Sequence, residues 1–215
     1  MKDYIIRKYE IGDRNDVRSI AADNAFIGQP VENIMDDRDF FNDIFMDAYL
    51  KDSSAFGFVA VFDGKVKGYI VGTDNSDKFR SVKLKYIIRT LYGILLFRYR
   101  IRARTLKYIL RRLRSMIRKE KVRTDLSDYP AHLHIDIDKK IRGKGVGSAL
   151  MHAFLNKIQK DGIQGVHLST TSHNEAAVKM YSKFGFGELK RGIGTEFDGM
   201  VEKDLYNLTM GLRFR

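Results

Sequence analysis

The chain of 215 residues contains no cysteine and only two prolines. Without cysteine it has no disulfide, no thiolate metal ligand and no cysteine nucleophile, so a cysteine-linked acyl-enzyme is excluded. No uncharged apolar run approaches the ~20 residues of a membrane-spanning helix, and Met1-Lys2-Asp3 opens no apolar signal segment. We therefore expect a cytoplasmic location. Because the chain has no Ser/Gly-rich linker and no internal repeat, residues 1–215 are predicted to form one domain.

Acidic residues are scarce in the middle of the chain. Residues 78–123 contain 17 Lys or Arg and one acid, Glu120, which is a net charge of +16; the whole chain carries +12, so the remainder is at −4. Two series of apolar residues recur in this segment at helical spacing: Phe79, Val82, Tyr86, Ile87, Leu91, Ile94 and Leu95, then Leu106, Ile109, Leu110, Leu113, Met116 and Ile117. Residues 77–124 are predicted to be an insertion of two basic amphipathic helices between the third and fourth strands.

The N-terminal part alternates between strand and helix patterns. Residues 4–9, 55–62 and 65–71 are predicted strands, and Asp63-Gly64 indicates a hairpin between the last two. A helix is expected to begin near Asp13 or Asn15. Residues 36–50 have apolar side chains at helical spacing and acids on the opposite face. Those acids are interpreted as a solvated face or as an attraction for an amine.

A strand, a glycine-rich turn and a helix follow one another at residues 133–150. Leu133, Ile135 and Ile137 alternate with polar residues, the turn reads R-G-K-G-V-G from Arg142, and the helix opens at Ser148. Glycines let backbone N–H groups approach a ligand, and a helix start adds unpaired donors, so this unit is suited to bind phosphate. It is not a P-loop, since no Gly-Lys-Ser/Thr occurs, and its spacing and position do not match a Rossmann turn.

A second motif lies downstream, between Val166 and Phe186. It reads N-x-x-A-x-x-M-Y from Asn174 to Tyr181, and then F-G-F. The seven residues from Asn174 to Tyr181 span close to two helical turns, so both side chains can lie on one helix face. Gly185 suits the C-terminal cap of that helix.

In order and separation, R-x-x-G-x-G followed by N-x-x-A-x-x-M-Y resembles the GNAT (GCN5-related N-acetyltransferase) superfamily. The resemblance implies an α/β fold: a mixed, mostly antiparallel sheet that splays between its fourth and fifth strands, with helices on both faces and, here, the basic helical insertion. It also implies acetyl-CoA as cosubstrate and a primary amine as acceptor. It requires no metal, and we assign none, although His132 and His134 stand two residues apart.

The sequence Y-P-A-H-L-H-I, from Tyr129, is similar to a bacterial GNAT branch that resembles the acetyltransferase-like domain of O-GlcNAcase. A helical insert before this strand is usual in that branch. This favours the interpretation that the apolar series of residues 77–124 pack on the domain while the basic residues surround an anionic cofactor. A membrane surface or acidic partner and nucleic acid are the other interpretations of the segment.

The resemblance also assigns residues to the cofactor. The backbone of Ile135 and Ile137 is expected to bind the pantetheine arm. The turn is expected to bind the pyrophosphate through residues 142–148: Arg142, Gly143, Lys144, Gly145, Val146, Gly147 and Ser148. Asn174 is expected near the pantetheine or the adenine.

Three side chains are candidates for catalysis. An amine must lose a proton to attack a thioester, and His134 or Asp136 beside the cofactor strand can accept it. In the family, the tyrosine that corresponds to Tyr181 gives a proton to the departing sulfur of CoA. For each of the three, a packed or hydrogen-bonded structural role is the alternative.

The predicted function is transfer of acetyl from acetyl-CoA to an unidentified amine by direct attack in a ternary complex. One alternative is a CoA-binding pseudo-acetyltransferase or regulatory domain. Another is a binding module whose basic insertion contacts membrane or nucleic acid. The protein is expected to be a monomer or a homodimer.

Overall fold

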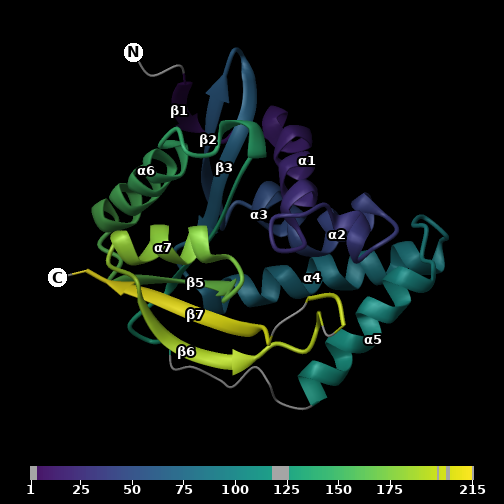
Figure 1. The fold of residues 1–215 in the computed structure, drawn as a ribbon. Helices are drawn as coiled ribbons and strands as arrows, with labels where there is room; N and C mark the ends of the chain where they lie inside the picture. Colours follow the sequence, from purple (N-terminus) through teal and green to yellow (C-terminus); the bar gives the residue numbers. More distant parts are fainter. Residues whose placement is uncertain (1–3, 118–125, 198, 202–203, 215) are drawn as a thin grey trace.

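Seven strands form one sheet in the order β1-β2-β3-β4-β5-β7-β6 in the computed structural model (Figure 1). The structure describes residues 4–117, 126–197, 199–201 and 204–214. All neighbouring strands are antiparallel except β4 and β5, which are parallel. The strands are β1 (Tyr4–Lys8), β2 (Phe56–Phe62), β3 (Lys65–Thr73), β4 (Ala131–Ile137), β5 (Gly165–Thr171), β6 (Gly187–Ile193) and β7 (Tyr206–Arg213).

The hairpin between β2 and β3 is confirmed. Its two turn residues both have positive φ, 46° at Asp63 and 73° at Gly64, and Phe62 pairs with Lys65. Two positive φ values in a two-residue turn match the right-handed twist of the flanking strands, which is why Asp-Gly predicts this turn.

Strands β4 and β5 separate soon after they meet. Their pairing is limited to Ala131 with Val166 and His132 with His167, although each strand has seven residues. From Leu133 to Ile137, β4 pairs with β3 on its other side only. The predicted splay between the fourth and fifth strands is therefore confirmed.

Helices cover both faces of the sheet (Figure 1). On one face lie α1 (Arg14–Asn24), α2 (Arg38–Phe45) and α3 (Asp47–Lys51); on the other lie α6 (Val146–Lys160) and α7 (Glu175–Lys183). Because side chains alternate along a strand, β3 contributes Tyr69 and Val71 to the core under α1–α3 and Ile70 to the core under α6. The fold is the mixed α/β arrangement that the sequence predicts.

Two further helices lie between β3 and β4, namely α4 (Ser76–Leu95) and α5 (Ala103–Ile117). Asn75 caps α4, since its side chain accepts from the N–H of Lys78 at 3.0 Å. The side chains of Met116 and Ile117, and all of residues 118–125, lie outside the described residues. Whether α4 and α5 are an insertion stays a prediction. None of the described helices is long and apolar enough to cross a membrane.

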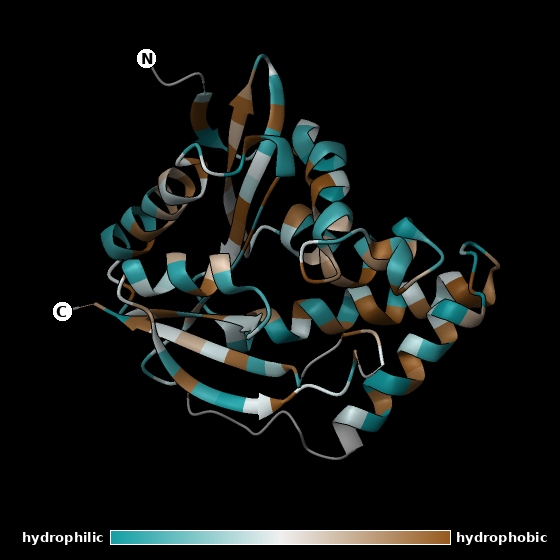
Figure 2. Cartoon of the chain, in the orientation of Figure 1, coloured by the Kyte–Doolittle hydropathy of each residue, from teal (hydrophilic) through white to brown (hydrophobic). Residues whose placement is uncertain are grey.

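The predicted packing of these helices is partly wrong. Of the predicted series in α4, Phe79, Val82, Tyr86 and Ile94 pack on the core, whereas Ile87, Leu91 and Leu95 are exposed. Helix α5 packs through Thr105, Tyr108 and Ser115; of its predicted apolar series, Ile109 packs on the core and Leu106, Leu110 and Leu113 are exposed. Figure 2 shows both helices with apolar and polar residues interleaved along their length. Apolar side chains of α4 lie on two sides of the helix, and the spacing alone cannot decide which side meets the core.

Candidate active site

The glycine turn leads directly into α6. Gly143 and Gly145 have φ of 79° and 78°, and Gly145 is the residue that precedes the helix. No side chain caps this helix start, and the first turn contains no acid. The first N–H groups of α6 therefore lack a side-chain acceptor, and a Cβ at Gly143 would meet nothing within 4 Å. Free donors beside open space form an anion-binding geometry.

Gly147 serves packing rather than turn conformation. A Cβ at this position would lie 2.9 Å from Cδ1 of Ile137 and 3.0 Å from Sδ of Met180. The absence of a side chain thus lets α6 start directly between the end of β4 and α7. Two motifs that are distant in the sequence meet at this point.

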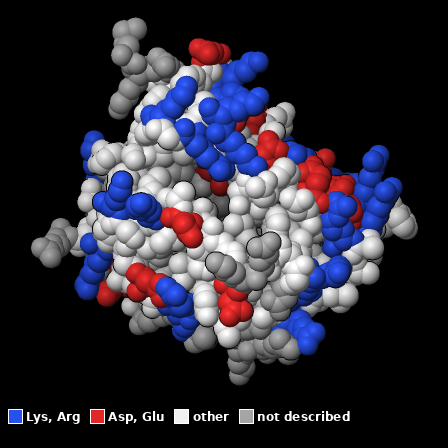
Figure 3. Space-filling view, viewed as in Figure 1, with Lys and Arg blue, Asp and Glu red and all other residues white. Residues whose placement is uncertain are grey.

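Arg142 is directed at α1. Its guanidinium donates to the side-chain oxygen of Asn24, and both terminal nitrogens lie 3.7 Å from where a Cβ of Gly28 would stand. Lys144 extends over the ring of Phe62, 5.1 Å from its centre. Figure 3 shows Lys and Arg gathered in this upper part of the molecule, where the turn and the start of α6 lie. The local charge is positive, as an anionic ligand requires.

The polar face of β4 carries the candidate bases. His134 Nε2 lies 3.3 Å from Asp136 Oδ2, and the Tyr69 hydroxyl donates to that same oxygen at 2.8 Å. Tyr69 is opposite Asp136 in the register of β3 and β4 and is fully buried, whereas 42% of the His134 side chain is exposed. The structure therefore places a partly exposed histidine against a carboxylate that a buried tyrosine holds in place.

Sequence reasoning missed Tyr69. A signal existed, because the antiparallel pairing of residues 65–71 with 133–137 puts one residue of the third strand beside each polar residue of the fourth. The register that selects Tyr69 for Asp136 comes only from the structure. Burial, and then the charge of Asp136, raises the pKa of Tyr69 well above its usual range, so its hydroxyl stays protonated and donates.

Tyr181 is buried on α7, with the ring of Phe186 6.0 Å away. Burial, followed by the charge of Asp136, raises its pKa above the ordinary value. The two candidates are thus close enough to influence each other. A phenol with a raised pKa is protonated at neutral pH, which is the state that a proton donor needs.

Asn174 immediately precedes α7. Its backbone carbonyl accepts from the N–H of Val178 at 3.0 Å, but its side chain does not cap the helix. It is half-buried, so its amide is accessible at the helix start. The roles predicted for Asn174, for the glycine turn and for Tyr181 remain predictions.

His132, another histidine of β4, was not given a role from the sequence. His132 Nδ1 lies 3.0 Å from the Tyr49 hydroxyl, and its ring is 4.9 Å from that of His167. Burial, and then the charge of Lys83, holds the pKa of His132 well below 6.5. His132 is therefore neutral at physiological pH. Among the described residues there is no group of three or more His, Cys, Asp or Glu that could hold a metal ion.

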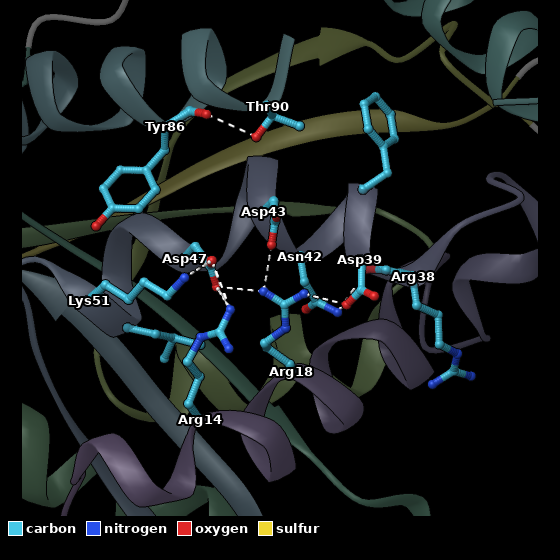
Figure 4. A network of polar contacts seen from close by, with 12 residues as sticks. Arg14, Arg18, Arg38, Asp39, Asn42, Asp43, Asp47, Lys51, Tyr86 and Thr90 are labelled. Atoms are coloured by element: carbon cyan, nitrogen blue, oxygen red, sulfur yellow. Dashed lines mark hydrogen bonds and ion pairs between the residues drawn. The ribbon is translucent and has the colours of Figure 1, made fainter. Parts of the chain in front are cut away.

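The acids of residues 36–50 form a buried ion-pair network with α1 (Figure 4). The Arg18 guanidinium contacts Asp43 and Asp47 at 2.7 Å and Asp39 at 2.6 Å. Arg14 also donates to Asp47, at 2.9 and 3.0 Å. The expectation of a solvated acidic face is wrong for Asp43 and Asp47, which are both buried. Their charges are already neutralised, so neither carboxylate is free to attract a substrate amine.

Comparison with known proteins finds similarity to acetyltransferases. The model of the "Acetyltransferase (GNAT) family" matches residues 121–186. The chain is 38% identical over 68 residues to N-alpha-acetyltransferase 30 of Schizosaccharomyces pombe, covering 32% of this chain and 44% of the relative. It is 34% identical over 59 residues to the mycothiol acetyltransferase of Actinosynnema mirum, covering 27% and 20%. The chain thus matches less than half the length of these curated relatives.

Likeness of structure extends over the whole chain. The crystal structure of SsHAT has a TM-score of 0.69 and 28% identity, with 98% of each chain covered. A GCN5-related N-acetyltransferase from Kribbella flavida has a TM-score of 0.61 and 14% identity, covering 99% of this chain and 98% of that one. The second likeness concerns the fold alone.

Proposed function

Because the chain belongs to the GNAT superfamily of acetyltransferases, we propose that it transfers the acetyl group of acetyl-CoA to a primary amine. One observation carries the proposal. The opening between β4 and β5 begins after His132, and at its other end β4 runs into the turn with the uncapped start of α6. A long cofactor with a thioester at one end and phosphates at the other fits such a path.

In this proposal acetyl-CoA lies along the free edge of β4. The backbone of Ile135 and Ile137 binds the pantetheine amides, in the part of β4 that has no β5 partner. The pyrophosphate accepts from the N–H groups of Val146, Gly147 and Ser148. Lys144 adds positive charge. Arg142 acts mainly through Asn24, by fixing the turn against α1.

The transfer needs one proton acceptor and one proton donor. If the neutral His134 ring donates from Nε2 to Asp136, its Nδ1 has a lone pair that can take the proton of the amine. The amine nitrogen then bonds to the thioester carbonyl carbon, and the carbon–sulfur bond breaks. Tyr181 protonates the leaving thiolate, so the products are an amide and free CoA.

The acceptor is a primary amine of unidentified structure. Its approach is proposed from the side of α1–α3, toward which the polar face of β4 is turned. A cytoplasmic location belongs to the same proposal, because acetyl-CoA is supplied there. Sedimentation equilibrium of the purified protein will separate a monomer from a homodimer.

The first test is calorimetric titration of acetyl-CoA into the wild type and the Gly145→Glu variant. Glutamate would add a negative charge where the pyrophosphate is expected and a Cβ at a φ of 78°. A matched control is Gly162→Glu, which adds the same side chain at a φ of 72° beyond the far end of α6. We expect micromolar binding by the wild type and the control, and none by Gly145→Glu. Absence of binding by the folded wild type would refute the proposal.

The second test is release of free CoA in the presence of a panel of primary amines. We expect at least one amine to stimulate release by the wild type and not by the His134→Gln variant. Binding of acetyl-CoA without stimulation by any amine class would instead favour the pseudo-acetyltransferase alternative.

A further inference from the structure

Helix α4 carries an apolar surface that the fold leaves bare. We define it as the α4 outer surface. Exposure increases toward the end of the helix, from 53% at Leu91 to 71% at Leu95, and reaches 94% at Phe97 just after it. Its members are all apolar and all exposed: Leu84, Ile87, Ile88, Leu91, Leu95, Leu96 and Phe97.

The spacing of these residues places them on one side of the helix. Leu84, Ile88, Leu91 and Leu95 follow steps of four, three and four residues, which is the repeat of a single helical stripe. The buried residues Phe79, Thr90 and Gly93 lie on a different side. Single exposed apolar side chains are ordinary, but a continuous stripe on a folded protein marks a contact surface.

The end of the stripe is held in position. Phe97 has a φ of 52°, which is rare for a bulky residue. Two residues further on, Tyr99 donates to Asp43 Oδ2 at 2.7 Å, and its ring lies where a Cβ of Gly93 would come within 2.6 Å of it. The N–H of Arg98 donates to the carbonyl of Gly93 at 2.9 Å. The fold thus fixes the backbone that projects Phe97 into solvent.

Basic residues flank the stripe. Lys78, Arg80, Lys85 and Arg89 are exposed on α4, and Arg100 and Arg102 are exposed beyond its end. The segment 78–123 has a net charge of +16. A surface that combines exposed aliphatic side chains with these exposed cations is complementary to a partner that is anionic outside and apolar beneath.

We propose that the α4 outer surface binds an anionic lipid membrane. Basic amphipathic helices lie in the interface of such membranes, with the apolar side chains below the headgroups and the cations among them. A second copy of this chain would bring like charges together. Nucleic acid would pair with the cations, but it would leave Leu91, Leu95 and Phe97 in water. The exposed residues Leu106, Leu110 and Leu113 of α5 can add to the contact.

The exposed α4 outer surface favours the membrane interpretation of the basic segment over the packed one. From the sequence, a packed role was preferred because a helical insert before the Y-P-A-H strand is usual in the branch that the chain resembles. The structure packs part of the first apolar series on the core, through Phe79, Val82, Tyr86 and Ile94, and leaves Ile87, Leu91 and Leu95 of that series exposed. The inference goes beyond acetyl transfer and does not depend on it.

The test is co-sedimentation of the full chain with vesicles of phosphatidylcholine, with and without phosphatidylglycerol. We expect binding to the anionic vesicles that weakens as salt is raised, and little binding to the neutral ones. The Leu95→Ser/Phe97→Ser variant should bind on the order of 100-fold more weakly, since two large side chains no longer enter the membrane. The Arg80→Gln/Lys85→Gln variant should lose roughly 30-fold, about fivefold per charge.

Matched controls separate this surface from general stickiness. Ile11→Ser removes an apolar side chain that is 67% exposed elsewhere, and Lys65→Gln/Lys160→Gln removes two exposed charges from other elements. Both controls should bind anionic vesicles almost as the wild type does. Circular dichroism and urea unfolding will establish that every variant is folded.

Three results would overturn the proposal. The first is a folded wild type that does not bind anionic vesicles at low salt. The second is a control variant that loses as much binding as the matching test variant. The third is a self-association or a duplex DNA affinity that depends on Leu95 and Phe97 while vesicle binding is absent.

Discussion

The buried network around Arg18 makes a prediction that needs no knowledge of the substrate. Asp47 has a side chain that is only 3% exposed and accepts from Arg14, Arg18 and Lys51. Asp39 also contacts Arg18, at 2.6 Å, but its side chain is 75% exposed. The substitutions Asp47→Asn and Asp39→Asn therefore remove one carboxylate each from the same guanidinium, at opposite extremes of burial.

The expected costs differ widely. Asp47→Asn leaves three cations facing an amide that can offer only one oxygen, and breaking a buried ion pair costs about 3–5 kcal/mol. Asp39→Asn breaks a pair that water already screens, for which about 0–1 kcal/mol is expected. Urea unfolding at pH 7 measures both free energies. A difference of less than about 1 kcal/mol between the variants would refute the reasoning that burial makes this network strong.

The pH dependence of the same stability difference gives a second test of the Asp47 ion pairs. Burial raises the pKa of Asp47, but hydrogen bonds from Lys51 and Arg14 and the charge of Arg18 outweigh it, so that the pKa is below its usual 3.8. A carboxyl with a lowered pKa contributes stability at higher pH, and this contribution is lost as the pH falls through the folded-state pKa. The advantage of the wild type over Asp47→Asn should therefore be full at pH 7 and shrink below about pH 4. A constant difference down to pH 2 would contradict the assignment.

Three further outcomes are expected. Tyr181→Phe should lower kcat by up to ~10²-fold without changing the KM for acetyl-CoA; an unchanged kcat in steady-state assays would leave Tyr181 a packing role. Gly147→Ala should lower the free energy of unfolding in urea by about 1–3 kcal/mol, because the new Cβ would lie 2.9 Å from Ile137. In the control Gly187→Ala the new Cβ meets nothing within 4 Å, so the free energy of unfolding should change little. Burial, together with nearby positive charge, keeps the pKa of His132 well below 6.5. The free energy of unfolding should therefore fall below pH 6.5 by about 1.4 kcal/mol per pH unit for this group. His132→Phe should flatten that slope, and an unchanged slope would contradict the lowered pKa of His132.

Local signals in the sequence were sufficient for much of the fold. Asp63-Gly64 defines a hairpin because few residues accept two positive φ values in succession. The glycine turn and the helix after it were recognisable because Gly143 and Gly145 have conformations that other residues rarely adopt. Such features depend on a few neighbouring residues, and a single sequence contains them.

Features that depend on distant pairing were not predictable in this way. The partnership of Tyr69 with Asp136 requires the register of two strands that are 67 residues apart at this point. From the sequence, the acids of α2 and α3 were interpreted as a solvated face, because nothing in their own segment indicates that Arg18 will lie among them. Helix α4 has apolar residues on two sides, and the single series that periodicity identifies contains residues of both, such as Phe79 on the packed side and Leu95 on the exposed one.

The proposed membrane surface and the proposed cofactor site lie in different parts of the molecule. Figure 1 shows the start of α6 at the upper left and the helices α4 and α5 at the lower right. A membrane bound at α4 would therefore leave the glycine turn open to acetyl-CoA from solution. We expect calorimetric titration with acetyl-CoA to give the same Kd for the free protein and for protein saturated with anionic vesicles. A Kd that rises on vesicles with the wild type but not with Leu95→Ser/Phe97→Ser would mean that the membrane covers the cofactor entrance, and that the two sites compete.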